Sequence, residues 1–173
     1  SHSCSEQIFK DGQLYIRAVS DCGYGTEKIL RQGGCSVITG GLGGIGRKLA
    51  EYLAYSYKAK LILIGRRSLD VKTSEWLSAL DEGALSAEYI VCDVSDADDM
   101  DRLIKAVPKA DGIFHCAGII DDCLIENKTI ESVKRVLAPK VYGTQNLYKL
   151  AQESGSGFLM LFSSVVSAWG NYG

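Results

Sequence analysis

The sequence predicts an α/β protein with a doubly wound parallel sheet, on three observations. Short apolar runs rich in Val, Ile, Leu and Phe alternate with stretches of helical periodicity. Within each run polar and apolar residues do not alternate, which is typical of strands buried on both faces of a sheet. The chain of 173 residues contains 19 glycines and 2 prolines, a balance that suits tight turns between uninterrupted elements.

Strands and helices are expected in strict alternation along the main part of the chain. The predicted strands are Cys35–Thr39, Lys60–Ile64, Glu88–Cys92, Gly112–Cys116 and Gly157–Phe162. Apolar residues at the spacing of one helix face predict three helices between them. The expected core positions are Ile45, Leu49, Leu53 and Tyr57, then Trp76, Leu77 and Leu80, then Met100, Leu103, Ile104 and Val107.

The longest helix is predicted from about Thr129 to Glu153, with Thr129 as its N-cap. Its core stripe runs through Val133, Leu137, Lys140, Thr144, Leu147 and Ala151. Lys140 therefore falls on the face expected to be buried, where a charged amine is costly unless the protein uses it. The alternative is a lysine whose stem packs while its amine reaches water. Pro139 can kink the helix at this point.

Residues 1–30 differ from the rest and are expected to form a separate element. The segment Ile8–Val19 holds a Lys10-Asp11-Gly12 turn between two extended pieces, and a polar, glycine-containing stretch follows. We predict an appended strand or hairpin with a linker, and a main domain over residues 31–173.

Composition argues against several classes of function. The net charge of −2 argues against a nucleic-acid surface. The apolar runs are far shorter than the roughly 20 residues that span a bilayer, so no membrane contact is expected. The six cysteines form no C-x-x-C pair, and the two histidines are His2, near the start of the chain, and His115, inside an apolar run. We therefore expect no metal site, and reduced thiols in a cytoplasmic protein.

The strongest local signal is the run Thr39-Gly40-Gly41-Leu42-Gly43-Gly44-Ile45-Gly46. It follows an apolar strand and opens an amphipathic helix, which is the context of a Rossmann-type dinucleotide-binding turn. Glycines there permit a tight turn and a close approach of the backbone, so that a diphosphate can bind amides at the positive end of the helix. The alternative is a glycine turn with a purely structural role.

The end of the second strand indicates which dinucleotide is bound. Arg66 lies 20 positions after Gly46, where sites that prefer NAD place an acidic residue for the ribose 2′-hydroxyl. A guanidinium there can bind a 2′-phosphate through forked hydrogen bonds. The sequence therefore favours NADP(H), the alternative being a solvated Arg66-Arg67 pair.

Two further strand ends belong to the expected cofactor site. Asp93-Val94 follows the third strand, and its carboxylate can accept a hydrogen bond from the adenine amino group. Ser95 or Asp96 would serve equally well as a cap for the following helix, so Asp93 alone is weak evidence for a cofactor site. The fourth strand ends in Cys116-Ala117-Gly118, small residues against which a cofactor can lie.

Taken together, these residues resemble the short-chain dehydrogenase/reductases. The motifs are Thr39-Gly40-x-x-x-Gly44-x-Gly46, Asp93-Val94, Ala117-Gly118 and the strand ending Phe162-Ser163-Ser164. Within that superfamily, T-G-G-x-G-G-x-G, His115-x-Ala117-Gly118, Pro139-Lys140-Val141 and the Gly-Asn-x-Gly after Ser164 are similar to ketoreductase domains of modular polyketide synthases. The resemblance covers residues 35–173, and Phe9–Val19 resembles the last strand of the structural subdomain that precedes the catalytic half.

This resemblance implies a reaction and the roles of two residues. The reaction is transfer of the 4-pro-S hydride of NADPH to the β-ketone of an acyl chain held on the phosphopantetheine of an acyl carrier protein. The implied roles are Ser164 orienting the ketone and Lys140 lowering the pKa of a tyrosine and holding the cofactor ribose. That tyrosine is expected 13 positions after Ser164, beyond Gly173. The sheet is therefore expected to be incomplete at its C-terminal side and the 173 residues alone inactive, with neighbouring synthase domains as further partners.

Two motifs that bear on stereochemistry disagree. Ile120-Asp121-Asp122 resembles the Leu-Asp-Asp of reductases that give the D-hydroxy (B-type) product, whereas Trp169 falls where L-hydroxy (A-type) enzymes carry a tryptophan. The acid pair favours B-type. Two other functions stay open: a non-catalytic, structural NADP-binding fold, and a free-standing reductase of a small ketone. The segment before residue 30 argues against the free-standing reductase.

Overall fold

The computed structural model describes residues 7–16, 23, 29–164 and 166. These residues fall into two units, which are treated separately. One unit contains residues 29–163, and the other contains the N-terminal segment together with Ser164 and Val166.

The N-terminal segment forms a β-hairpin. Strand β1 (Gln7–Lys10) pairs antiparallel with strand β2 (Gln13–Ile16), and Asp11 and Gly12 connect them. The φ angles of Asp11 and Gly12 are 52° and 76°, the left-handed conformation that two-residue hairpin turns require and that Asp-Gly supplies readily. The Lys-Asp-Gly turn therefore makes the hairpin that the sequence predicts.

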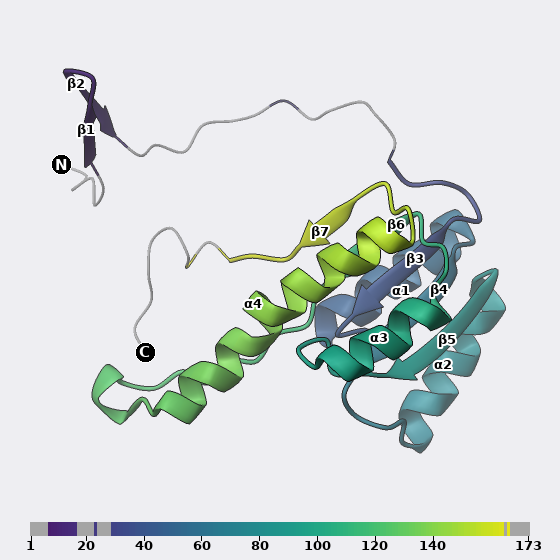
Figure 1. Cartoon of the computed structure of the whole chain (residues 1–173). Helices are drawn as coiled ribbons and strands as arrows, with labels where there is room; N and C mark the ends of the chain where they lie inside the picture. The colour runs from purple at the N-terminus through teal and green to yellow at the C-terminus, as the bar shows by residue number, and fades with distance from the viewer. Residues whose placement is uncertain (1–6, 17–22, 24–28, 165, 167–173) are drawn as a thin grey trace. The chain divides into compact units, whose positions relative to one another are not determined.

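Residues 29–163 form a five-stranded parallel sheet in the order β5-β4-β3-β6-β7 (Figure 1). The strands are β3 (Cys35–Thr39), β4 (Lys60–Gly65), β5 (Ser86–Val91), β6 (Gly112–His115) and β7 (Leu159–Leu161). The chain winds from β3 outward through β4 to β5, then returns to β6 on the other side of β3. This confirms the doubly wound α/β fold, and it places a topological switch point between β3 and β6, where such sheets bind ligands.

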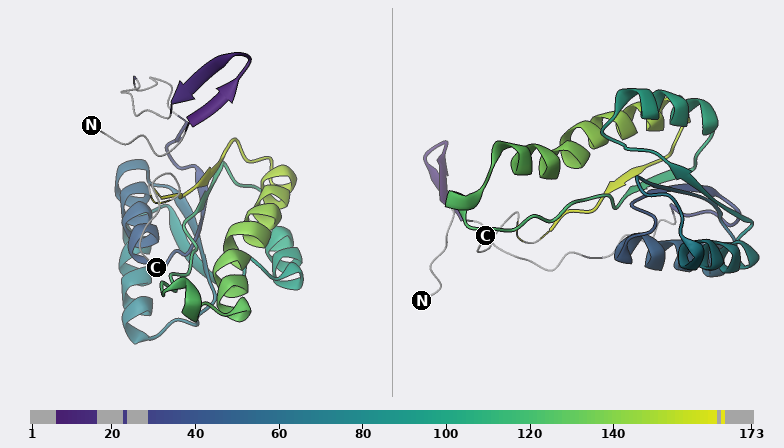
Figure 2. Two further views of the ribbon diagram at one scale, coloured as in Figure 1. Left: turned by 90° about the vertical axis from the view of Figure 1, so that its left-hand side faces the viewer. Right: turned by 90° about the horizontal axis from the view of Figure 1, so that it is seen from below.

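Helices cover both faces of this sheet (Figure 2). Helices α1 (Gly44–Tyr57) and α2 (Val71–Gly83) pack on one face, and α3 (Ala97–Ala106) and α4 (Ile130–Glu153) on the other. Side-chain caps begin three of them: Asp70 for α2, Asp96 for α3 and Thr129 for α4. A short 3₁₀ helix (Ile125–Asn127) precedes α4.

The edges of the sheet differ from the prediction. Buried strands β3, β4 and β6 match the expected apolar runs, but β5 and β7 are the outer strands and are only partly covered. Val91, for example, is 54% exposed. Neither edge strand is therefore buried on both faces, and β5 begins at Ser86, before the apolar run that predicted it.

The buried faces of two helices also differ from the predicted stripes. In α1, Ile45 is 59% exposed, because the small residues Gly46, Ala50 and Ala54 face the sheet together with Leu53. In α4 Leu147 is buried as expected, but the other buried residues, Pro139, Gly143 and Leu150, each lie one residue before an expected position. Lys140, Val133 and Leu137 are consequently exposed. Small side chains bring α4 close to the sheet, and sequence periodicity underrates them because they carry little hydrophobic surface.

Candidate cofactor-binding site

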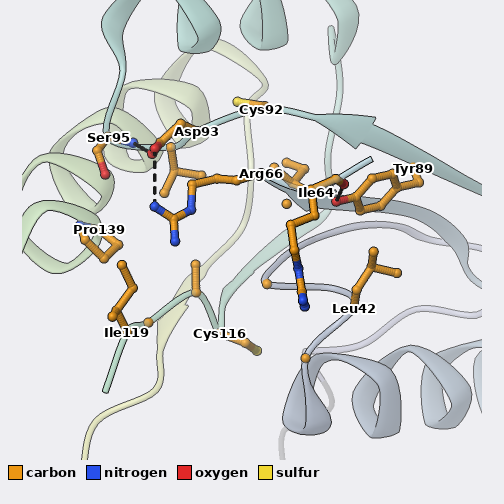
Figure 3. Close-up of a pocket in the computed structure, with 17 residues that line it drawn as sticks. Leu42, Ile64, Arg66, Tyr89, Cys92, Asp93, Ser95, Cys116, Ile119 and Pro139 are labelled. Atoms are coloured by element: carbon orange, nitrogen blue, oxygen red, sulfur yellow. Dashed lines mark hydrogen bonds and ion pairs between the residues drawn. The ribbon is translucent and has the colours of Figure 1, made fainter. Parts of the chain in front are cut away.

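A cavity of about 280 Å³ opens at the carboxyl ends of the central strands (Figure 3). It lies at the switch point between β3 and β6 and is near the lower end of the volumes of small-molecule sites. The expected cofactor residues that line it are Gly40, Leu42, Gly43, Arg66, Asp93, Val94, Cys116, Ala117 and Gly118. Segments from four strand ends thus meet at one place.

The glycine run forms a turn that approaches its neighbours too closely for side chains. Gly40 has a φ of +65°, and a Cβ there would lie 2.9 Å from the backbone of Cys116 and Ala117. A Cβ on Gly46 would press on the carbonyl oxygen of Gly40 and lie 2.9 Å from Cα of Gly41. The structural interpretation of the run therefore accounts for Gly40, Gly41 and Gly46. The last two are buried and lie outside the cavity lining.

Gly44 needs another explanation, because a Cβ there would meet nothing within 4 Å. It is the first residue of α1. The N-cap of α1 is Gly43, which has no side chain to cap the helix, whereas α2, α3 and α4 each begin with a side-chain cap. The first amides of a helix lack intrahelical partners and favour an anion. Gly44 is exposed and lies outside the cavity lining, and its open position leaves room for a diphosphate close to the backbone.

Arg66 and Asp93, which the sequence places on separate strands with separate roles, face each other across the cavity. Figure 3 shows the side chain of Arg66 turned toward Asp93, with 3.8 Å between the guanidinium nitrogen Nη1 and Oδ2. The two side chains are 56% and 37% exposed, so the ion pair is weak and open to competition by a ligand. The other carboxylate oxygen of Asp93 accepts from the amide of Ser95.

Several cavity residues were not expected from the sequence: Ile64, Gly65, Arg67, Tyr89, Cys92, Ser95, Ile119 and Pro139. Most of them are neighbours of expected residues at strand ends, and could have been found by extending each motif by one position. Tyr89 is different, because it reaches over Gly65 from the edge strand β5 and its hydroxyl donates to the carbonyl of Arg67 at 2.6 Å. Only the register of β4 against β5 brings it there.

Burial makes the two thiols beside the cavity, those of Cys92 and Cys116, weak acids. Burial raises the pKa of Cys92 to about 12 and that of Cys116 to about 11. Cys35, Cys92, Cys116 and Cys123 carry free thiols. With so little thiolate at neutral pH, Cys92 and Cys116 act as small apolar side chains of the wall.

Thr39 lies outside the cavity lining and is fully buried. Its hydroxyl oxygen accepts from the amide of Ala117 at 3.2 Å and lies 2.7 Å from Nδ1 of His115. It therefore holds the ends of β3 and β6 together rather than facing a cofactor. Ile45 is also outside the lining, on the exposed side of α1.

Lys140 is exposed on α4, but its amine points back toward the sheet. Its Nζ lies 3.6 Å from the position that a Cβ on Gly118 would occupy, and Gly118 lines the cavity. Pro139, the residue before it, is buried and also lines the cavity. The amine is thus next to the cavity wall without being enclosed.

The Ile120-Asp121-Asp122 segment is held by Asp121. Its carboxylate accepts hydrogen bonds from the Ser132 hydroxyl and the Arg135 guanidinium, both on the first turns of α4, and its carbonyl accepts from Lys128. The Ser132 hydrogen bond and then Arg135 hold the pKa of this carboxyl below its usual range. Asp121 thus anchors the loop to α4, whereas Ile120 and Asp122 are exposed.

The remaining candidate residues lie outside this unit or outside the described residues. Ser164 belongs to the other unit, where its hydroxyl oxygen accepts from the amide of Val166 at 3.2 Å. Trp169 lies outside the described residues. In the part of the chain that is described, no group of three or more potential metal-ligating side chains is found, and no helix is long and apolar enough to cross a bilayer.

Comparison with known proteins identifies the family. The model of the KR domain matches residues 34–173, more than three quarters of the chain. The chain belongs to the KR domain family. A ketoreductase from the macrolactin assembly line has 39% sequence identity and a TM-score of 0.79 over 93% of this chain. A ketoreductase domain from the bacillaene assembly line has 29% identity and a TM-score of 0.86 over 96% of it.

Curated relatives of this KR chain are much longer proteins. Polyketide synthase PksM of Bacillus subtilis is 35% identical over 83% of the chain, which spans 4% of PksM. Erythronolide synthase EryA2 of Saccharopolyspora erythraea is 36% identical over 78% of the chain, again 4% of that protein. The chain also spans 33% of the macrolactin ketoreductase and 41% of the bacillaene one.

Proposed function

We propose that this chain provides the cofactor-binding part of a ketoreductase that uses NADPH to reduce the β-keto group of an acyl chain carried on an acyl carrier protein. Membership of the KR family supports the reaction class. The observation that supports NADPH in particular is Arg66, whose half-exposed guanidinium lies in the cavity wall at the end of β4, where an NAD site has an acid.

Each part of the cavity has a task in this proposal. The amides at the start of α1 bind the diphosphate, with Gly44 leaving room for it. Asp93 accepts from the adenine amino group and Arg66 donates to the 2′-phosphate, so their mutual ion pair opens when the cofactor binds. NADPH, when bound, supplies the hydride.

The reaction itself is assigned to Lys140, beside the cavity, and to Ser164. The ammonium of Lys140 holds the cofactor ribose and lowers the pKa of the proton donor, and the hydroxyl of Ser164 donates to the ketone oxygen as negative charge develops on it. The proton donor expected from the KR resemblance falls beyond Gly173. Neighbouring synthase domains and an acyl carrier protein are the proposed partners, since the named relatives are polyketide synthases.

The test is the affinity of the 173-residue chain for NADPH and NADH before and after substitution of Arg66. Arg66→Gln removes the charge, whereas Arg66→Asp adds a carboxylate facing Asp93 and so combines two effects. A charge-assisted hydrogen bond contributes about 1.5–3 kcal/mol, so Arg66→Gln is expected to weaken NADPH binding about 10- to 150-fold. NADH affinity should change little. Fluorescence titration of the bound nicotinamide measures both constants.

Two variants serve as controls. Arg67→Gln changes the neighbouring cavity arginine, and Lys109→Gln makes the same charge change on an exposed residue before β6, at the opposite end of the strands. Only Arg66→Gln should abolish the preference for NADPH. An unchanged ratio of the two affinities in Arg66→Gln, or an equal loss in Arg67→Gln, would remove Arg66 from this role.

A further inference from the structure

His115 connects the cavity strands to α4 through a chain of hydrogen bonds. Its ring is buried, with Nδ1 2.7 Å from the hydroxyl oxygen of Thr39 and Nε2 2.8 Å from the carbonyl oxygen of Pro139. A carbonyl only accepts, so Nε2 must carry the proton. The amide of Ala117 already donates to the Thr39 oxygen, and the hydroxyl proton of Thr39 is then donated to the bare Nδ1. With a neutral imidazole, every donor and acceptor in this series of hydrogen bonds has a partner.

The carbonyl oxygen that accepts from Nε2 of His115 belongs to Pro139, the residue immediately before Lys140. Helix α4 packs tightly at this point, because a Cβ on Gly143 would lie 2.9 Å from Val94 and 3.6 Å from the His115 ring. The next polar contact along the helix is Asn146, whose amide donates to the carbonyl of Val94 at 2.9 Å. Before Pro139 the helix presents exposed apolar residues such as Val133 and Leu137. The hydrogen bond from His115 to Pro139 therefore holds α4 against the sheet at the residue next to Lys140.

The charges around His115 agree with this geometry. Burial lowers the pKa of His115, and the nearby charge of Lys140 lowers it further, while the bond to Pro139 acts in the opposite direction. The ring is thus neutral at physiological pH and close enough to Lys140 to sense its charge. A neutral ring can hold the peptide before the lysine without repelling the ammonium.

We propose that His115 is a positioning residue for Lys140. By donating from Nε2 to the Pro139 carbonyl, it fixes the height and rotation of this turn of α4 and so directs the lysine amine to the cavity edge beside Gly118, where the cofactor ribose would bind. This inference rests on the proposed function, because it gives Lys140 a ligand to hold.

The protonation state is tested first, on the unsubstituted chain. The chain has only two histidines, His2 and His115, so a His2→Gln variant assigns the imidazole signals in a ¹⁵N NMR spectrum. At neutral pH we expect His115 to show a protonated Nε2 and a bare Nδ1. A protonated Nδ1, whether in the other neutral tautomer or in the imidazolium, would overturn the proposal.

Two substitutions test the roles of the two ring nitrogens separately. The amide of His115→Asn reaches about as far as Nδ1 and keeps the contact with Thr39, whereas that of His115→Gln reaches about as far as Nε2 and can still donate to Pro139. We expect His115→Asn to weaken NADPH binding about fivefold, the value of one ordinary hydrogen bond, and His115→Gln to restore most of the loss. Equal losses in the two variants would show that the bond to Pro139 is not what matters.

A double-mutant cycle with Lys140→Met shows whether the effect passes through the lysine. Lys140→Met alone should weaken NADPH binding about tenfold or more, and His115→Asn should then cost less than about twofold. The control is Asn146→Ala, which removes another bond between α4 and its neighbours, and whose effect should be equal in both backgrounds. If either histidine variant fails to fold, the tautomer and the other variant still decide.

The outcomes distinguish this inference from the proposed function. An effect of His115→Asn that is the same with and without Lys140 would overturn the positioning role and leave the function of Lys140 untouched. NADPH affinity that does not change in Lys140→Met would overturn the assignment of Lys140 itself, and the positioning role with it.

Discussion

The two sides of the cavity are built by different kinds of contact. On the first side, at the glycine turn between β3 and α1, backbone packs directly against backbone, as where Gly46 meets Gly40 and Gly41. On the second side, at β6 and α4, side-chain hydrogen bonds hold the elements behind the wall together: Thr39 with His115, His115 with Pro139, and Asp121 with Ser132. We therefore expect added side-chain atoms to destabilise the first side. The second side should be destabilised when its polar groups are substituted or titrated.

The largest effect is expected for Gly46→Ala, on the first side. The new methyl group would meet the backbone of Gly40 and Gly41, which cannot move without opening the turn. Overpacking of this kind typically costs about 1–3 kcal/mol and sometimes more, and we expect about 3 kcal/mol here because the contacts are all backbone. Denaturant unfolding of the two chains measures the difference.

Gly44→Ala is the matched control in the same turn. Its methyl group has open space, and alanine in a helix is favoured over glycine by about 1 kcal/mol, so stability should be equal or higher. NADPH affinity should nevertheless fall, because the methyl group fills the position proposed for the diphosphate. Destabilisation as large as that of Gly46→Ala would contradict the distinction between the two glycines.

Local patterns predicted the glycine turn well, because the contacts of Gly46 with Gly40 and Gly41 lie within one motif. The run from Thr39 to Gly46 specifies a strand, a turn and a helix start in eight residues, and Thr129 likewise predicts the start of α4. The sequence could not place Tyr89 over Gly65, since that contact depends on how β5 aligns with β4.

The second side could not be predicted because its contacts join residues far apart in the chain. Nothing near His115 in the sequence indicates that its partners are Thr39 and the Pro139 carbonyl, 76 and 24 positions away. Periodicity placed Lys140 on the buried face of α4, and the buried residues at this point lie one position earlier because Pro139 and Gly143 pack despite their size. The sequence singled out Lys140 because a charged residue on that stripe is unusual, and its role in the site stays a prediction.

A moderate effect on stability is expected from pH on the second side. His115 has a pKa below 6.5 when folded and near 6.5 when unfolded, so the unfolded chain binds the extra proton first as the pH falls. The stability associated with the neutral ring is complete above pH 6.5 and is lost on acidification down to the folded pKa. The slope cannot exceed about 1.4 kcal/mol per pH unit for one proton.

Denaturant unfolding at a series of pH values from 8 to 5 should show this loss, and the His115→Gln variant should not. The carboxyl of Asp121 titrates separately, because its pKa lies below the usual 3.8 and its contribution is lost only at lower pH. A pH profile that is unchanged by His115→Gln would mean that the ring does not titrate differently in the two states.

The smallest effect is expected for Asp121→Asn, which weakens the anchor between the loop and α4. The side chain is near the surface and its partners are exposed in part, so global stability should change little. The loop and the first turn of α4 should instead open more often, because Leu124, Ile125 and Ile130 are exposed and offer little packing. Hydrogen exchange over residues 119–132 measures the opening, and Asp122→Asn, the same change on the exposed neighbour, should leave it unchanged. Equal protection in all three chains would mean that the backbone holds this loop by itself, as it does in the glycine turn, and the contrast between the two sides would then be confined to His115.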